Sequence, residues 1–371
     1  MGNEKQVIER LLAEAEITPN GDKEYDPQIN DPRFYKRALQ EKSLGLGESY
    51  MEGWWDCRSP DQFFHRLLAA DLDKKVRNNP KLLMSVGWNM IINPGRKSKA
   101  FEIGQHHYDI GNDLYRAMLD KRLSYTCGYW KDVSTLDEAQ QAKLDLVCKK
   151  INLQPKQRVL DIGSGWGCFI KYASEHYGAE ADGITVSQEQ KVLADEMCCG
   201  IPARTHLKDY RDISGHYDHV VSLGMFEHVG QKNYRTFMKA IHRVLDDGGL
   251  FLLHTIGGNK SVSGSDPWIT KYIFPNSMIP SMAQITKAIE GLFVLEDCHS
   301  FGADYDKTLM AWNTNFCDHW PELKNKYDDR FYRMWTYFLL SCAGSFRARK
   351  NQLWQLVLSK RGVPGGYHAV R

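Results

Sequence analysis

The stretch RVLDIGSGWG, residues 158–167, decides the fold. Its first half is apolar apart from Arg158 and Asp161, so it predicts a short buried strand that runs directly into a glycine turn. The turn has the spacing G-x-G-x-G, which permits the tight backbone angles and the close helix packing of a ligand-binding edge. A strand, a glycine turn and a helix in this order indicate an open α/β sheet.

The patterns that follow this turn alternate between helix and strand. LDDGG at residues 245–249 predicts a helix that ends in a glycine turn before a core strand. An amphipathic helix is expected over residues 138–151, ahead of the first strand. The other expected strands are residues 180–185, 217–223, 250–256, 293–297 and 353–359. Such alternation predicts a doubly wound sheet with helices on both faces.

The first quarter of the sequence is helical by pattern. Helices are expected over residues 5–16, 32–40 and 60–92, with the glycine- and tryptophan-rich stretch 44–55 as a turn. NPGRK at residues 93–97 predicts a linker. We therefore expect a smaller helical N-terminal domain over residues 1–93 and a catalytic domain over residues 94–371.

Composition and charge narrow the class of protein. The net charge of +2 is too small for a nucleic-acid-binding protein. Basic clusters at residues 74–77 and 96–99 are either solvated helix ends and linkers or contacts to anionic lipid headgroups.

The location of the protein also follows from the sequence. Nine cysteines without C-x-x-C spacing indicate reduced thiols. The N-terminus lacks a secretory signal, and no apolar run is long enough to span a bilayer. The sequence predicts a cytoplasmic protein that is soluble or peripheral to the membrane.

The glycine turn points to a cofactor. G-x-G-x-G differs from the dinucleotide pattern G-x-G-x-x-G. An acid two residues before the first glycine is typical of methyltransferases that bind S-adenosylmethionine. The sequence therefore predicts a class I S-adenosylmethionine-dependent methyltransferase, Rossmann-like, with a seven-stranded mixed sheet. Asp161, Gly163, Gly165 and Gly167 are its expected cofactor-binding residues.

Further cofactor contacts are expected beyond the turn. In many such enzymes an acid at the tip of the second strand holds the ribose, but Asp182 lies inside that strand. We therefore favour Thr185 and Gln190 as contacts and take Asp182 as structural. Asp209 and Tyr210 could hold the adenine by a hydrogen bond and a stacking face. Tyr125 and Thr126 are assigned to the cofactor as well.

Two polar residues follow the fourth and fifth core strands. These are Glu227 in GMFEHVG and His254 in LLHTIG. Ligands of open α/β sheets lie at the carboxyl ends of the strands. A carboxylate and an imidazole at this edge could form an acid–base pair or hold a small polar ligand.

At this point the sequence resembles a known family. The matching stretches are SLGLGESYMEGWWD, HYDIGNDLY, YTCGYW, LDIGSGWG, GMFEHVG, LLHTIG, DPWITKYIFP, FGADYD, CAGSFRAR and LWQLVLS. They resemble the cyclopropane-fatty-acyl-phospholipid synthase family of bacteria and, more distantly, the mycolic acid cyclopropane synthases. One departure is Ser164, where close relatives often have cysteine, and we expect it to be tolerated.

The resemblance implies a reaction on unsaturated acyl chains of membrane phospholipids. The cis double bond attacks the sulfonium methyl group, and loss of a methyl proton closes a three-membered ring. The family holds bicarbonate as the base. The resemblance assigns its ligands to Cys127, Glu227, His254, the backbone of Ile256, and Tyr305. A Glu227 side chain beside that anion should have a raised pKa, from burial and the neighbouring charge.

The resemblance also bears on Cys342 and on partners. A cysteine at the position of Cys342 has been regarded as catalytic, but packing on its apolar helix is the other explanation. The family implies a homodimer and association with the inner face of the membrane, with the N-terminal domain as a docking element or a dimer contact.

Three alternatives stay open. A small-amine N-methyltransferase on the same fold is one, although it is less compatible with the full bicarbonate set. A methyltransferase that adds a methyl or methylene branch to the acyl group shares the same chemistry up to ring closure. An inactive homologue that binds S-adenosylmethionine or lipid is the alternative from a different class.

Overall fold

The structure, a computed structural model, describes residues 2–72, 75 and 110–371. The expected linker at 93–97, the expected domain boundary after residue 93 and most of both basic clusters lie outside these residues. The protein forms two compact units. The helical unit comprises Met1–Met118, Ser265–Pro275 and Leu309–Lys350, and the sheet unit comprises Leu119–Gly264, Asn276–Thr308 and Asn351–Arg371.

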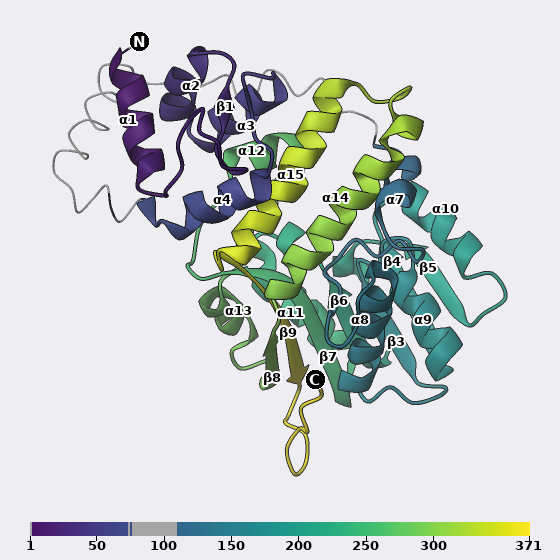
Figure 1. Ribbon diagram of the computed structural model, residues 1–371. Helices are drawn as coiled ribbons and strands as arrows, with labels where there is room; N and C mark the ends of the chain where they lie inside the picture. Colours follow the sequence, from purple (N-terminus) through teal and green to yellow (C-terminus); the bar gives the residue numbers. More distant parts are fainter. Residues whose placement is uncertain (1, 73–74, 76–109) are drawn as a thin grey trace. The chain divides into compact units, whose positions relative to one another are not determined.

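A seven-stranded mixed sheet forms the centre of the sheet unit (Figure 1). The strand order is β5-β4-β3-β6-β7-β9-β8. The five strands from β5 to β7 are parallel, and β9 runs antiparallel between β7 and β8. The strands are β3 (Arg158–Ile162), β4 (Glu180–Thr185), β5 (Ala203–Leu207), β6 (Tyr217–Leu223), β7 (Leu245–Gly258), β8 (Val294–Ser300) and β9 (Asn351–Ser359). The predicted fold class is confirmed.

Successive residues of the strands face opposite layers of helices. Val159 packs with α8 (Leu136–Lys150) and α9 (Cys168–Tyr177). Its neighbour Leu160 packs in the second core with α11 (Tyr234–Val244) and α13 (Met282–Ile289). This alternation follows from the two-residue period of a strand, and it makes the central strands apolar on both faces. α10 (Gln188–Met197) joins β4 to β5.

One predicted turn is wrong. LDDGG does not form a turn after a helix, because β7 already begins at Leu245. Leu245 pairs with Tyr217, and Leu250 pairs with His219, so the pairing is irregular between these two points. The extra residues on β7 form an irregularity inside the strand, and the glycines lie within it.

The described part of the helical unit is built from short helices around a long one. α15 (Asp329–Arg347) packs against α3 and α4. The elements are α1 (Gly2–Ala13), α2 (Arg33–Glu41), α3 (Ser43–Met51), α4 (Pro60–Ala69), α7 (Asn112–Met118), α12 (Pro267–Tyr272), α14 (Ala303–Leu323, in this unit from Leu309) and the short strands β1 (Gln28–Ile29) and β2 (Trp55–Asp56). Segments 265–275 and 309–350, expected in the catalytic domain, thus belong to this unit.

The glycine-rich stretch 44–55 is mostly a helix rather than the expected turn. A Cβ atom on Gly45 would lie 2.4 Å from the Arg37 carbonyl oxygen, and one on Gly47 would lie 2.4 Å from the Trp268 ring. The glycines of α3 therefore permit close packing against α2 and α12, and they do not mark a break in the helix.

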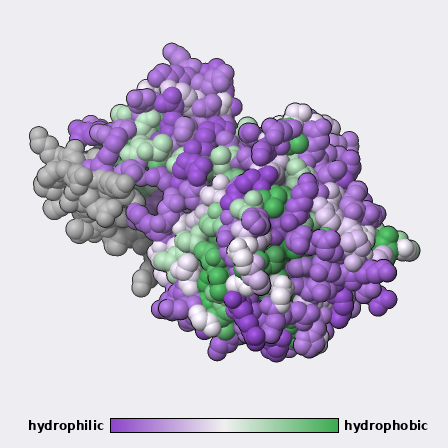
Figure 2. All heavy atoms as spheres, turned by 90° about the horizontal axis from the view of Figure 1, so that it is seen from below, coloured by the Kyte–Doolittle hydropathy of each residue, from purple (hydrophilic) through white to green (hydrophobic). Residues whose placement is uncertain are grey.

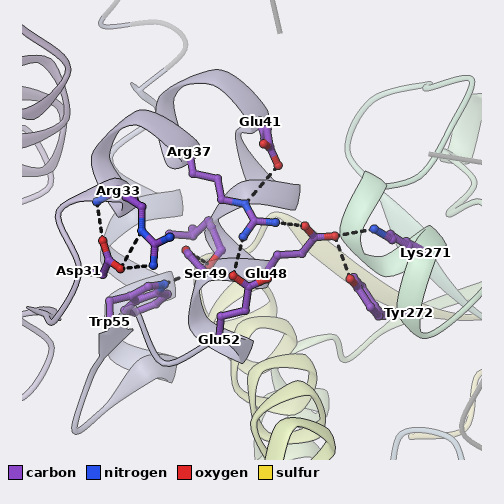
Figure 3. Close-up of polar contacts among 11 residues, drawn as sticks. Asp31, Arg33, Arg37, Glu41, Glu48, Ser49, Glu52, Trp55, Lys271 and Tyr272 are labelled. Carbon is purple, nitrogen blue, oxygen red and sulfur yellow. Dashed lines mark hydrogen bonds and ion pairs between the residues drawn. The ribbon is translucent and has the colours of Figure 1, made fainter. Parts of the chain in front are cut away.

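Glu48 of α3 joins α2, α3 and α12 within the helical unit (Figure 3). Its buried carboxylate accepts from Arg37, from Lys271 Nζ at 2.6 Å and from Tyr272 OH at 2.8 Å. Burial would raise the pKa of Glu48, but the hydrogen bonds from Lys271 and Tyr272 outweigh it and hold the pKa below its ordinary value.

We expect Glu48→Ala to lower the free energy of unfolding by about 3 kcal/mol, the lower end of the range for a broken buried pair, because it leaves the partly buried cations Arg37 and Lys271 without this carboxylate. The measurement is urea denaturation of the full-length protein. Glu41→Ala is the matched control: its carboxylate also contacts Arg37, at 3.4 Å, but its side chain is 40% exposed. The control should change stability by less than about 1 kcal/mol. Equal effects of both variants would contradict the assignment.

The face of the molecule in Figure 2 is largely hydrophilic, with hydrophobic residues gathered in patches. Large hydrophobic side chains that are exposed in the described ranges are Val186, Val192, Leu207, Val262, Val294 and Leu295. Within the described ranges, none of the helices is long and apolar enough to cross a membrane.

Candidate active site

The glycine turn follows β3 as the sequence predicts. Gly163, Gly165 and Gly167 have φ values of 86°, 55° and 83°, all in the left-handed region that favours glycine. Gly167 is the residue before α9, and a Cβ atom on Gly163 would lie 2.6 Å from Met225 Cβ. The turn therefore brings backbone close to the start of the Glu227 segment.

Asp161 lies at the carboxyl end of β3 and is 2% exposed. Its Oδ1 atom has no hydrogen-bond partner among the residues that the structure describes. Burial raises the pKa of this carboxyl to about 7, and the charge of Lys143 opposes that rise. A buried carboxylate oxygen without a donor fits the ammonium of an amino-acid ligand, as the methionine part of S-adenosylmethionine has.

The structure brings Thr185 and Gln190 together after β4. The Thr185 hydroxyl donates to the side-chain oxygen Oε1 of Gln190 at 2.7 Å. Ser187 caps α10, because its Oγ accepts a hydrogen bond from the backbone N–H of Gln190. Asp182 instead bonds His206 at 2.9 Å and Tyr217 OH at 3.2 Å. The structural interpretation of Asp182 agrees with these contacts.

Asp209 and Tyr210 follow β5 as expected, but both already have partners. The Asp209 carboxylate accepts from Arg211 Nε at 2.7 Å, and that hydrogen bond lowers its pKa. The Tyr210 ring is buried in the core, edge-on to Phe237 at 5.2 Å between centroids. The expected stacking face of Tyr210 is therefore largely used in packing.

The stretch that contains Tyr125 and Thr126 is held by α8. Gln140 Nε2 donates to the Thr126 carbonyl at 2.7 Å, and Lys143 Nζ donates to Thr126 Oγ1 at 3.0 Å. Both side chains of α8 are fully buried. The sequence patterns did not single them out, although two polar residues three apart on an otherwise apolar helix face are the signal that could have found them.

Glu227 lies in the short 3₁₀ helix Phe226–His228 after β6 and is 6% exposed. Its Oε1 accepts the Ile256 N–H at 2.6 Å, and its Oε2 has no partner within the described ranges. Burial raises the pKa of Glu227 to about 7, although the Ile256 bond lowers it. The expected rise in pKa is present from burial alone.

His254 projects from β7 on the same face as Leu252, which belongs to the α8 and α9 core. Gln355 of β9, its cross-strand partner, lies with Nε2 3.2 Å from His254 Nδ1. In this arrangement Gln355 donates, so the neutral imidazole carries its proton on Nε2. Burial lowers the pKa of His254 well below its ordinary value, and His254 Nε2 has no partner among the described atoms.

Other residues of the expected anion site have different surroundings. The Ile256 N–H, expected as a donor to an anion, donates to Glu227 instead. Cys127 is fully buried, and burial raises its pKa well above the ordinary value, so it is a thiol. Thr308 Oγ1 lies 3.9 Å from the Cys127 sulfur. Tyr305 is buried in the first turn of α14.

Cys342 belongs to the helical unit, on α15. Burial raises the pKa of its thiol to about 12, so it is not a nucleophile at neutral pH. Cys342→Ala should keep kcat/KM within about twofold of the unmodified protein, since a packing residue contributes nothing to the transition state. Lipid methylation assays measure this, and a loss of more than about tenfold with an unchanged Tm would contradict it.

The sequence is similar to known proteins over most of its length. Residues 95–356 match the family described as mycolic acid cyclopropane synthetase. The protein is 48% identical over 366 residues to the cyclopropane-fatty-acyl-phospholipid synthase of Escherichia coli, covering 99% of this sequence and 96% of that protein. It is 30% identical over 365 residues to the tuberculostearic acid methyltransferase UfaA1 of Mycobacterium tuberculosis, covering 91% and 83%.

Solved structures give the same result. The mycolic acid cyclopropane synthase CmaA1, complexed with SAH and CTAB, superposes with a TM-score of 0.64 at 29% identity, covering 69% of this protein and 96% of that one. The fold and the glycine turn define an S-adenosylmethionine-dependent methyltransferase. The protein belongs to the mycolic acid cyclopropane synthetase family.

Proposed function

We propose that this protein transfers a methylene group from S-adenosylmethionine to the cis double bond of unsaturated acyl chains in membrane phospholipids, forming cyclopropane fatty acids. The observation that carries the proposal is a pair of buried polar atoms without described partners, Glu227 Oε2 and His254 Nε2. Glu227 follows β6, and His254 lies on the neighbouring strand β7 opposite Leu223, the last residue of β6. The similarity over nearly the whole sequence to a synthase of this name supports the lipid acceptor.

The anion site is part of the proposal. Bound S-adenosylmethionine supplies an electrophilic methyl group, and bound bicarbonate supplies a base. Glu227 and His254 would hold the anion, with Cys127 and Tyr305 as further ligands. The Glu227 carboxyl, with a pKa of about 7, can be protonated and donate a hydrogen bond to the anion. The neutral imidazole of His254 can donate a second hydrogen bond from its Nε2–H group. The amide of Ile256 contributes by orienting Glu227, and the Ile256 carbonyl oxygen could contact the anion only by accepting from the bicarbonate hydroxyl.

Burial of these residues serves the chemistry. The alkene would attack the methyl carbon as its bond to the sulfonium sulfur breaks and S-adenosylhomocysteine leaves. A positive charge would develop on the acyl group, and transfer of one proton from the new methyl group to the bound anion would close the ring. Water in the pocket would trap that charge, so a dry site is required. Cys127, Glu227, His254 and Tyr305 are each less than 9% exposed.

The test is incubation of the full-length protein with S-adenosylmethionine carrying a labelled methyl group and vesicles of an unsaturated phospholipid. The expected product is a labelled acyl group that survives catalytic hydrogenation as a ring. Absence of label in the lipid would refute the proposal and favour an inactive homologue.

The second candidate is a C-methyltransferase of acyl groups that leaves a methyl or methylene branch. A similar protein named tuberculostearic acid methyltransferase motivates it. Mass spectrometry of the hydrogenated lipids separates the two products, because either branch is then a saturated methyl branch, heavier than the ring product by one molecule of hydrogen.

The partners are likewise proposed. We infer a homodimer that acts in the cytoplasm at the inner face of the membrane, with residues 1–93 as lipid-docking or dimer-contact elements. Sedimentation with anionic vesicles at low and high salt tests docking, and analytical ultracentrifugation tests the dimer.

A further inference from the structure

Lys143 of α8 is a buried cation that the proposed reaction does not use. Its side chain is fully buried, and its ammonium donates a 3.0 Å hydrogen bond to Thr126 Oγ1. It forms no ion pair with the residues in the described ranges. A buried ammonium without an anion costs several kcal/mol. A ligand that carries a carboxylate would supply such an anion.

The nearby carboxylates do not fill this role. Asp120 accepts from the backbone amides of Ser124 at 2.7 Å and Arg122 at 3.1 Å. Asp161 is two residues after Val159 on β3, so both side chains point to the same face of the sheet, the face covered by α8. Its Oδ1 nevertheless has no described donor. One face of the sheet thus carries a buried acid and a buried ammonium that are not bonded to each other.

Lys143 and Thr126 both keep hydrogen-bond donors that a ligand could use. An ammonium has three N–H groups, and Thr126 accepts one of them. Because Thr126 Oγ1 accepts from Lys143, its own hydroxyl hydrogen is free to donate elsewhere. Gln140, one turn earlier on α8, fixes the Thr126 backbone at 2.7 Å. The donors are therefore held in place before a ligand arrives.

We propose that Lys143 and Thr126 bind the α-carboxylate of the methionine part of S-adenosylmethionine, while Asp161 receives its α-ammonium. An amino-acid zwitterion is matched by a cation and an anion on the same face of the sheet. The proposal rests on the cofactor site proposed above and adds to it a carboxylate-binding residue.

The test is calorimetric titration of the full-length protein with S-adenosylmethionine and with its decarboxylated analogue, which lacks only the α-carboxylate. Lys143→Met should weaken binding of S-adenosylmethionine by about 10- to 100-fold and binding of the analogue by less than about threefold. Thr126→Val should also weaken binding of S-adenosylmethionine more than binding of the analogue, and should change the ratio of the two dissociation constants by about 3- to 10-fold.

Lys150→Met is the matched control, because Lys150 is also fully buried on α8 and instead contacts His299 at 3.0 Å. The ratio of the two affinities should not change in it. Equal weakening of both ligands by Lys143→Met would overturn the proposal and leave Lys143 a structural residue. If Lys143→Met does not fold, the affinity ratio of Thr126→Val decides. Failure of the unmodified protein to bind either ligand would instead refute the cofactor site itself.

Discussion

Glu227→Gln is expected to lower kcat for lipid cyclopropanation by about 10²- to 10⁴-fold, the range for a group that takes part in proton transfer. The glutamine keeps an acceptor for the Ile256 amide but cannot share a proton with an anion. The dissociation constant for S-adenosylmethionine should stay within about twofold, since Glu227 is not assigned to the cofactor. Initial rates on vesicles of unsaturated phospholipid measure kcat, and calorimetry measures the dissociation constant for S-adenosylmethionine. His228→Gln, an exposed neighbour on the same 3₁₀ helix, is the control and should keep its rate.

The same substitution should stabilise the protein at alkaline pH. Folding raises the pKa of Glu227 from 4.5 to about 7. A raised carboxyl pKa means that the folded state holds its proton longer than the unfolded state. Stability of the unmodified protein therefore falls as pH rises from about 4.5 to 7, and Glu227→Gln removes that fall. The gain at pH 8 relative to pH 4 should be on the order of 3 kcal/mol. Urea denaturation at both pH values checks the sign, and a variant that is less stable at pH 8 contradicts it.

Asp161→Asn is expected to raise the dissociation constant for S-adenosylmethionine by about 10- to 100-fold, because a charged hydrogen bond to the ligand ammonium is lost. Burial raises the pKa of Asp161 to about 7 in the free protein. Binding of an ammonium requires the ionised form, so affinity in the unmodified protein should fall as pH drops below about 7. The asparagine variant should lose this pH dependence.

Asp182→Asn separates this effect from general damage to the sheet. Asp182 is also an acid on a central strand, but its carboxylate is bonded to His206 and Tyr217. We expect it to lower stability and to leave cofactor affinity and its pH dependence unchanged. If both variants weaken binding equally, Asp161 does not contact the cofactor.

The sheet could be predicted from sequence where burial is periodic and turns are marked. The bounds of β3, β4 and β6 match the expected residues. β3 and β6 each end directly before a glycine, Gly163 and Gly224, which marks the end of the strand. The pattern failed at residues 44–55 and 245–249. In both places glycine provides close approach or an irregular pairing, which depends on neighbours that local sequence does not reveal.

The sequence predicted which residue types form the candidate site and which strands precede them, but it did not predict their hydrogen bonds. Glu227 follows β6 as expected, whereas His254 lies inside β7, which continues to Gly258. The use of the Ile256 amide by Glu227 and the orientation of His254 by Gln355 depend on register between strands distant in sequence. Lys143 was missed because an amphipathic helix is judged by its apolar residues. The composition of the helical unit, with segments 265–275 and 309–350, likewise depends on tertiary contacts.

The position of β9 between β7 and β8 has a consequence for synthesis on the ribosome. β7 pairs with β6 on one side, but its other edge must wait for residues 351–359. β8 emerges earlier and pairs with β9 instead of β7. A nascent polypeptide therefore carries an open strand edge, with His254 on it and without Gln355, until β9 is made. Polypeptides released before that point would lack an oriented imidazole and would expose a surface prone to association.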